Sequence, residues 1–130
     1  MTDPLESLLV SNEEVNRELL AITLADRVRI DRDTGEIIPL PGWNTLRPRQ
    51  RILAFLLAGR AAVALDVMSV ASFLPRQVIS GTGVPAGTVK RELREMIADR
   101  LVSQESSRAY YIPGFALERA AAIVRGDVDG

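Results

Sequence analysis

Apolar residues recur at helical spacing in the first part of the chain. Ser11 and Glu14 have the form of a capping box, and apolar side chains then follow at roughly helical steps. These side chains are Val15, Leu19, Ile22 and Leu24. We therefore expect an amphipathic helix that ends near Asp26.

Two short apolar runs come next and flank a polar cluster. Residues 28–30 and 37–38 enclose residues 31–36, in which Gly35 suits a positive φ near the tip of a turn. This pattern predicts a β-hairpin. Residues 39–42 are then expected to close the strand and to form a linker up to Trp43.

The segment after Trp43 is the most apolar of the chain. Asn44 or Thr45 is expected to cap a helix with Pro48 in its first turn, where a missing N–H costs nothing. The apolar residues Ile52, Leu53, Phe55, Leu56 and Leu57 cover too much of its circumference for a surface helix. The helix should therefore be central to the core, and the pattern leaves open whether it continues through residues 61–65 or loosens at Gly59. The run is interrupted by Arg60 and is shorter than the roughly 20 residues of a membrane-spanning helix, so we expect no membrane span.

Residues 72–112 predict two helices followed by a second hairpin. A short helix over residues 74–80 should stop at 81–83, and a longer one should run from Ala86 to about Arg100. The longer helix has one apolar face, formed by Val89, Leu93, Met96, Ile97 and Leu101. Its other side presents Gly87, Thr88, Lys90, Arg91, Arg94 and Glu95. Two helices joined by a Gly-containing turn match a helix-turn-helix, and residues 101–104 and 109–112 form a plausible β-hairpin around 105–108.

A last helix is expected to open near Pro113. Its apolar residues are Phe115, Leu117, Ala120, Ala121, Ile123 and Val124. Two accounts of this helix remain open: it folds back onto its own domain, or it forms a homodimer seam together with the N-terminal helix. The predicted fold class is mainly α with small β-hairpins (α+β). Residues 1–43 form an N-terminal arm of a helix and a hairpin, residues 44–126 form the main domain, and residues 127–130 form an acidic tail.

The net charge of −1 conceals an uneven distribution of charge. Residues 1–43 hold four Arg against nine acidic residues, whereas residues 44–126 hold twelve Lys or Arg against six acidic residues. A basic module with an acidic arm and tail can concentrate an electric field where phosphate would dock.

The composition excludes several classes of chemistry. The chain has neither cysteine nor histidine, which excludes thiolate chemistry, imidazole acid–base catalysis and Cys/His zinc sites. Residues 31–35 do not match a calcium-binding loop, because their glycine is not at the required position and the Glu that such a loop needs later is missing. We therefore expect no enzyme, no metal and no cofactor. The N-terminus does not have the pattern of a secretory signal, so the expected location is cytoplasmic.

The run from Gly81 through Leu93, closing on residues 97–102, resembles the winged helix-turn-helix superfamily of transcription regulators. The resemblance covers about residues 46–112 and makes residues 44–126 the winged helix-turn-helix domain. It implies that Gly83 and Val84 form the turn and that the helix from Ala86 reads DNA. Pro85 departs from the pattern, because such helices often start with a Ser or Thr cap. The residues that the resemblance and the charge pattern place at DNA are Gly87, Thr88, Lys90, Arg91 and Arg94 on the reading helix, and Ser107 and Arg108 at the wing tip. Arg47, Arg49 and Arg51 are further expected to contact the DNA backbone.

The sequence thus predicts a double-stranded DNA-binding regulator that forms a homodimer and reads the major groove. An alternative is a winged-helix adaptor that binds another protein, because the fold alone does not prove DNA binding. A second alternative is a replication or partition factor of a mobile element, which would share the DNA chemistry.

Overall fold

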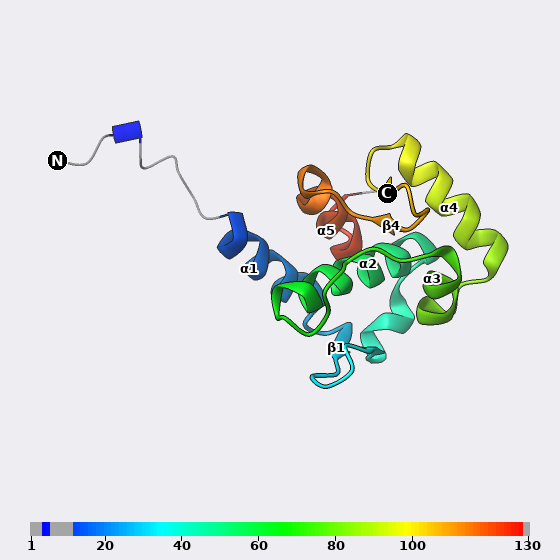
Figure 1. Cartoon of the computed structure of the whole chain (residues 1–130), viewed down its shortest axis with the longest axis horizontal. Coiled ribbons are helices and arrows are strands. Elements are labelled where there is room, and N and C mark those ends of the chain that lie inside the picture. Colours follow the sequence, from blue (N-terminus) through cyan, green and yellow to red (C-terminus); the bar gives the residue numbers. More distant parts are fainter. Residues whose placement is uncertain (1–3, 6–11, 129–130) are drawn as a thin grey trace.

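A computed structural model of the chain describes residues 4–5 and 12–128 and has an α+β architecture, as the sequence predicts (Figure 1). Its helices are α1 (Asn12–Leu24), α2 (Pro48–Ala64), α3 (Pro75–Thr82), α4 (Ala86–Ala98) and α5 (Leu117–Arg125). Two short 3-10 helices, η2 (Pro41–Thr45) and η3 (Gly114–Ala116), precede α2 and α5. The strands are β1 (Val28–Ile30), β2 (Ile37–Pro39), β3 (Ser103–Gln104) and β4 (Tyr110–Tyr111). The capping box expected at Ser11 lies outside the described residues.

Helix α2 is the centre of the molecule, with α1, α3, α4 and α5 all in contact with it (Figure 1). Every residue from Ile52 to Ala58 is buried, which confirms the prediction of a core helix. Its N-cap is Arg47 rather than Asn44 or Thr45, because those two residues belong to η2. The helix passes through Gly59 without loosening. A Cβ at Gly59 would lie 2.7 Å from Cζ of Phe73, so glycine there admits the ring.

Helix α5 folds back onto its own chain. Its apolar residues Leu117, Ala120, Ala121, Ile123 and Val124 are all buried against the core. The buried amide of Gln50 on α2 donates a hydrogen bond to the carbonyl oxygen of Ile123 (3.0 Å). Of the two accounts that the sequence left open, folding back is therefore the one that the structure shows for these apolar residues, and a homodimer stays a prediction. Leu20, Leu24, Val28 and Trp43 belong to the same hydrophobic cluster, so the part of the arm from Leu20 to Trp43 shares one core with the main domain.

The first hairpin forms where the sequence predicts it. Strands β1 and β2 pair antiparallel, with Val28 opposite Pro39 and Ile30 opposite Ile37. Gly35 has a φ of +76° in the connecting turn. The strand extends one residue further than expected, because Pro39 still takes part in the pairing.

The second half of the molecule contains a helix, a tight turn, a helix and a hairpin. Helix α3 continues through Gly81 to Thr82 and ends at Gly83, whose φ of +73° breaks the helix. The hydroxyl of Thr82 stabilises this turn by accepting from the N–H of Val84 (3.2 Å). Helix α4 ends at Ala98, two residues earlier than expected. Strands β3 and β4 pair antiparallel, and the backbone of Tyr110 on β4 also exchanges two hydrogen bonds with Phe73, which precedes α3.

No helix within residues 12–128 has the length and apolar character needed to cross a membrane.

Candidate nucleic-acid interface

The residues of α4 fall into three rows along the helix, each with steps of three and four residues. Such residues lie one above another on the same side of a helix. Val89, Leu93 and Met96 form the first row, and at most 1% of each is exposed to solvent. The second row is acidic and consists of Glu92, Glu95 and Asp99, the residue that caps the helix. The third row, Gly87, Arg91 and Arg94, is exposed.

Ile97 does not belong to the buried row, in contrast to the sequence prediction. It is 38% exposed, and Met96 fills the core at that level of the helix. The reason is geometric: one residue is about 100° of rotation in an α-helix, so Met96 and Ile97 cannot both point at α2. Val89, Leu93 and Met96 therefore anchor α4.

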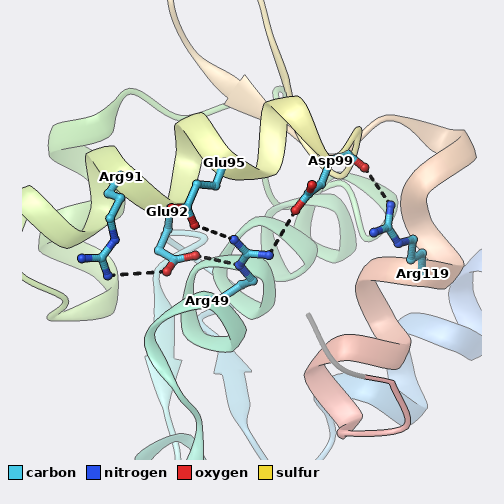
Figure 2. Close-up of polar contacts among 6 residues, drawn as sticks. All are labelled: Arg49, Arg91, Glu92, Glu95, Asp99 and Arg119. Carbon is cyan, nitrogen blue, oxygen red and sulfur yellow. Dashed lines mark hydrogen bonds and ion pairs between the residues drawn. The ribbon is translucent and has the colours of Figure 1, made fainter.

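Arg49 of α2 binds all three carboxylates of the acidic row (Figure 2). Its Nε donates to Glu92 at 2.7 Å, its Nη2 to Glu95 at 3.0 Å and its Nη1 to Asp99 at 3.3 Å. Figure 2 shows the guanidinium reaching up from α2 between these side chains. A single arginine thus uses its planar fork of donors to hold one flank of α4 against α2.

Burial and charge act in opposite directions on Arg49. Its side chain is only 17% exposed, and this desolvation by itself lowers the pKa of the guanidinium. The hydrogen bond and charge of Glu92, together with Asp99, outweigh burial and raise the pKa above its ordinary value. Arg49 is therefore a fixed positive charge at every physiological pH.

This arrangement bears on the expectation that Arg49 contacts the DNA backbone. Three of its five N–H donors face carboxylates of α4 and its side chain is only 17% exposed, so Arg49 serves first to join α2 to α4. Arg51 is also engaged within the chain, because its Nε donates to the carbonyl oxygen of Leu46 (3.0 Å). Arg47, the first of the three, is exposed, and its side chain has no hydrogen bond or ion pair within the described residues.

The cations of α4 remain available at the surface. Arg91 is 57% exposed and lies 3.7 Å from an oxygen of Glu92, a separation longer than a hydrogen bond. Lys90 and Arg94 are exposed, and in the described part of the chain neither side chain has a hydrogen-bonding or charged partner. Gly87 lies in the first turn of α4 with nothing within 4 Å of the position of a Cβ. Thr88 is half-buried and lies three and four residues before Arg91 and Glu92.

Both candidate residues of the loop between β3 and β4 are exposed. Ser107 donates from its hydroxyl to Glu105 (3.1 Å), so it helps to hold the loop. Arg108 is exposed and has a φ of +72°, an uncommon conformation for a residue with a side chain. Of the two, Arg108 is the better placed to meet a phosphate.

Arg76, in the first turn of α3, was missed by the sequence analysis. It is exposed, and no side-chain partner is present among the described residues. A lone arginine next to a proline carries no pattern of its own. The signal that could have found it is its position in the helix that precedes the turn.

Other arginines of the chain are bound to backbone carbonyl oxygens. Arg17 donates to Ala64 (2.7 Å), Arg60 to Ile112 (2.8 Å) and Arg119 to Asp99 (2.7 Å), the last of which is drawn in Figure 2. The cations thus divide by location. Those of α1, α2 and α5 mostly tie elements together, whereas Arg76, Lys90, Arg91, Arg94 and Arg108 lie on α3, α4 and the β3–β4 loop with their charges directed to solvent.

The described residues contain no group of three or more His, Cys, Asp or Glu side chains arranged to hold a metal ion. No protein-family model matches the chain, and no curated protein or solved structure matches it either.

Proposed function

We propose that the protein is a winged helix-turn-helix DNA-binding protein that reads the major groove with α4. The order of elements supports this proposal: α2, the short pairing at Phe73, α3, a turn, α4 and the β3–β4 hairpin follow one another as in a winged helix. In this proposal the β3–β4 loop is the wing. Its biological role would be that of a cytoplasmic transcription regulator, and a replication or partition factor would use the same DNA chemistry.

One observation carries the proposal: the separation of acidic and basic rows on α4. A helix with three acids and three cations would present a mixed surface if each pair met on the outside. Here Arg49 binds the three acids on the flank that faces α2 (Figure 2), with Glu95 and Asp99 still about half exposed. Lys90, Arg91 and Arg94 are exposed. Arg94 lies four residues after Lys90 and three after Arg91, and each of these like-charge pairs costs a few tenths of a kcal/mol in the free protein. A polyanion would relieve this repulsion.

In this proposal each exposed group has a role. The major groove is about 12 Å wide and admits one helix, whose first turns meet the base edges. Gly87 allows the backbone of α4 to approach closely, and Arg91 and Arg94 can donate two hydrogen bonds each to guanine or to phosphate. We further propose that the exposed Arg76, Arg108 and Arg47 contact phosphates. Such contacts set the position of the protein without reading sequence.

The decisive experiment is selection of bound sequences from a random duplex pool, followed by fluorescence anisotropy on the selected site. We expect enrichment of a defined sequence and an affinity that falls steeply with salt, since each phosphate contact releases counterions. The double variant Arg91→Ala/Arg94→Ala should bind at least about tenfold more weakly, given roughly 1–3 kcal/mol for a good base contact.

Arg32→Ala is the matched control for this experiment. Arg32 is an exposed cation in the β1–β2 loop, remote from α4 (Figure 1). Its removal lowers the net charge in the same way as each α4 substitution and should leave binding nearly unchanged. Equal binding by the double variant and the wild type would refute α4 as the reading helix.

A second candidate function is protein binding, which one observation favours. Phe115 is 76% exposed and lies with Ile97 and Arg100 around a small cleft at the far end of α4. An adaptor that docks a partner here would show no DNA binding at any salt concentration. Loss of that partner in Phe115→Ala, with Arg91→Ala/Arg94→Ala unaffected, would identify this function.

A further inference from the structure

An apolar groove lies on the side of the molecule opposite α4, between α1, β1 and the C-terminal part of α2 (Figure 1). Its volume is about 630 Å³, which falls within the range of small-molecule sites. Its walls include Leu20, Leu24, Val28, Ile30, Ala61 and Leu65. Leu65 is 53% exposed, an unusual amount for a large aliphatic side chain in a wall. The groove takes no part in the DNA-binding surface, so the inference below is independent of the proposed function.

Two arginines stand at the groove and are held in place by the backbone. Arg17 donates from Nη1 to the carbonyl oxygen of Ala64 (2.7 Å), and Arg29 donates from Nη1 to that of Ala25 (3.0 Å). Each guanidinium has five N–H donors, and the remaining donors have no hydrogen bond within the described residues. Among the side chains that the structure describes, Glu18 is the one acidic residue that lines the groove. The described charged groups at the groove, Arg17, Arg29 and Glu18, are therefore net positive.

We propose that this groove binds an amphipathic anion, a small molecule with an aliphatic or aromatic body and one carboxylate. The apolar walls remove the body from water, which favours binding of an aliphatic or aromatic group. The carboxylate meets the guanidinium of Arg17 or Arg29, which are the geometric match for a planar, two-oxygen anion.

The charged side chains at the groove argue against a second copy of the chain as its occupant. A two-fold interface places the same surface patch of both copies together. Four guanidiniums would then meet two carboxylates in an apolar seam, and removing uncompensated charge from water is costly. An anion of opposite charge has no such cost and neutralises the groove.

Isothermal titration calorimetry of the full chain with decanoate, below its micelle concentration, tests the proposal. We expect one molecule of decanoate bound per chain. Decylammonium has the same tail and the opposite charge, and it should bind at least about tenfold more weakly. Arg29→Gln should weaken decanoate binding about three- to tenfold, because one charged partner is lost while a side-chain donor to Ala25 is kept.

Ala21→Phe provides a steric test of the location. Ala21 is an exposed groove residue on α1, so a phenyl ring there occupies the groove without disturbing the core. This variant should lose decanoate binding, whereas the same change at the exposed Ala98 of α4 should not. Circular dichroism melting curves establish that both variants fold.

Three outcomes would overturn the proposal. The first is no decanoate binding, or equal binding by wild type and Ala21→Phe. The second is decylammonium binding as tightly as decanoate. The third is a wild-type dimer in size-exclusion chromatography with light scattering that Ala21→Phe converts to a monomer, since the groove would then hold a second copy. DNA binding is measured separately, so its failure would not be confused with any of these results.

Discussion

Arg49 on α2 and Glu92 on α4 are joined by a 2.7 Å hydrogen bond between Nε and Oε2, with both side chains largely removed from solvent. This contact does two things at once. It fixes α4, the proposed reading helix, on α2, and it draws the carboxylate of Glu92 away from the surface where we propose that DNA lies. The stability of the protein and its DNA affinity should therefore change together when Arg49 is altered.

Arg49→Met should lower the free energy of unfolding by about 1–3 kcal/mol, a value between those for exposed and fully buried ion pairs. Chemical denaturation in urea measures this change. DNA affinity should also fall, because three unpaired carboxylates would face an incoming phosphate backbone. Arg125→Met is the control: its pair with Asp127 (2.9 Å) is partly solvent-exposed, and its loss should cost no more than about 1 kcal/mol. If the two variants were equally stable, Arg49 would not hold α4 in place.

Gly59→Ala should destabilise the protein by about 1–2 kcal/mol. The new methyl group would press on Phe73, whose ring packs on Phe55 with centroids 4.7 Å apart. Overpacking of a filled core typically costs 1–3 kcal/mol, and the better helix propensity of alanine offsets part of this. Thermal and urea unfolding check the prediction. A gain in stability would mean that the ring has room to move.

Gly87→Ala should stabilise the protein and weaken its binding to DNA. A Cβ at Gly87 meets nothing within 4 Å, so alanine should stabilise α4 by about 0.5–1 kcal/mol. The same methyl group would stand between the first turn of α4 and the base edges. Urea unfolding and fluorescence anisotropy on one preparation separate the two effects. Tighter DNA binding by this variant would contradict a close approach at Gly87.

We expect Asp31, in the loop between β1 and β2, to make a contribution to stability that is lost in acid. The backbone N–H groups of Thr34 (3.0 Å) and Asp33 (2.8 Å) donate to its carboxylate and lower its pKa below the ordinary value of 3.8. Because the folded state favours the ionised form, this contribution to stability is present above about pH 4. It is lost as the pH falls through the lower pKa of the folded state.

Carbon-13 NMR titration of the Asp31 carboxyl group measures that pKa directly. Asp31→Asn keeps an oxygen acceptor for both N–H groups and should remove this part of the stability loss at low pH. A titration midpoint at or above 3.8 would show that the two hydrogen bonds do not persist in solution.

The alternation and spacing of residues by themselves determined the helices, the two hairpins and the tight turn at Gly83. These features depend on interactions within a few residues of one another: a helical apolar period, a glycine with positive φ, a proline in a first turn. Local rules predicted them well, with errors of one to three residues at the ends of α2, α3 and α4. Ile97 shows the limit of such rules, because adjacent residues on α4 cannot both point at α2, and only packing selected Met96.

Only the tertiary structure decided which charges are used inside the protein and which remain outside. Arg49 and Glu92 are 43 residues apart, and no local pattern pairs them. The sequence equally allowed Glu92 and Glu95 to neutralise Arg91 and Arg94 within the same helix. Folding placed α2 against one flank of α4, so the arginine of another helix binds the acids and leaves the cations of α4 at the surface. The position of α5 against the core of its own chain was also decided by the tertiary structure. The sequence alone does not say which apolar faces of the molecule pack together.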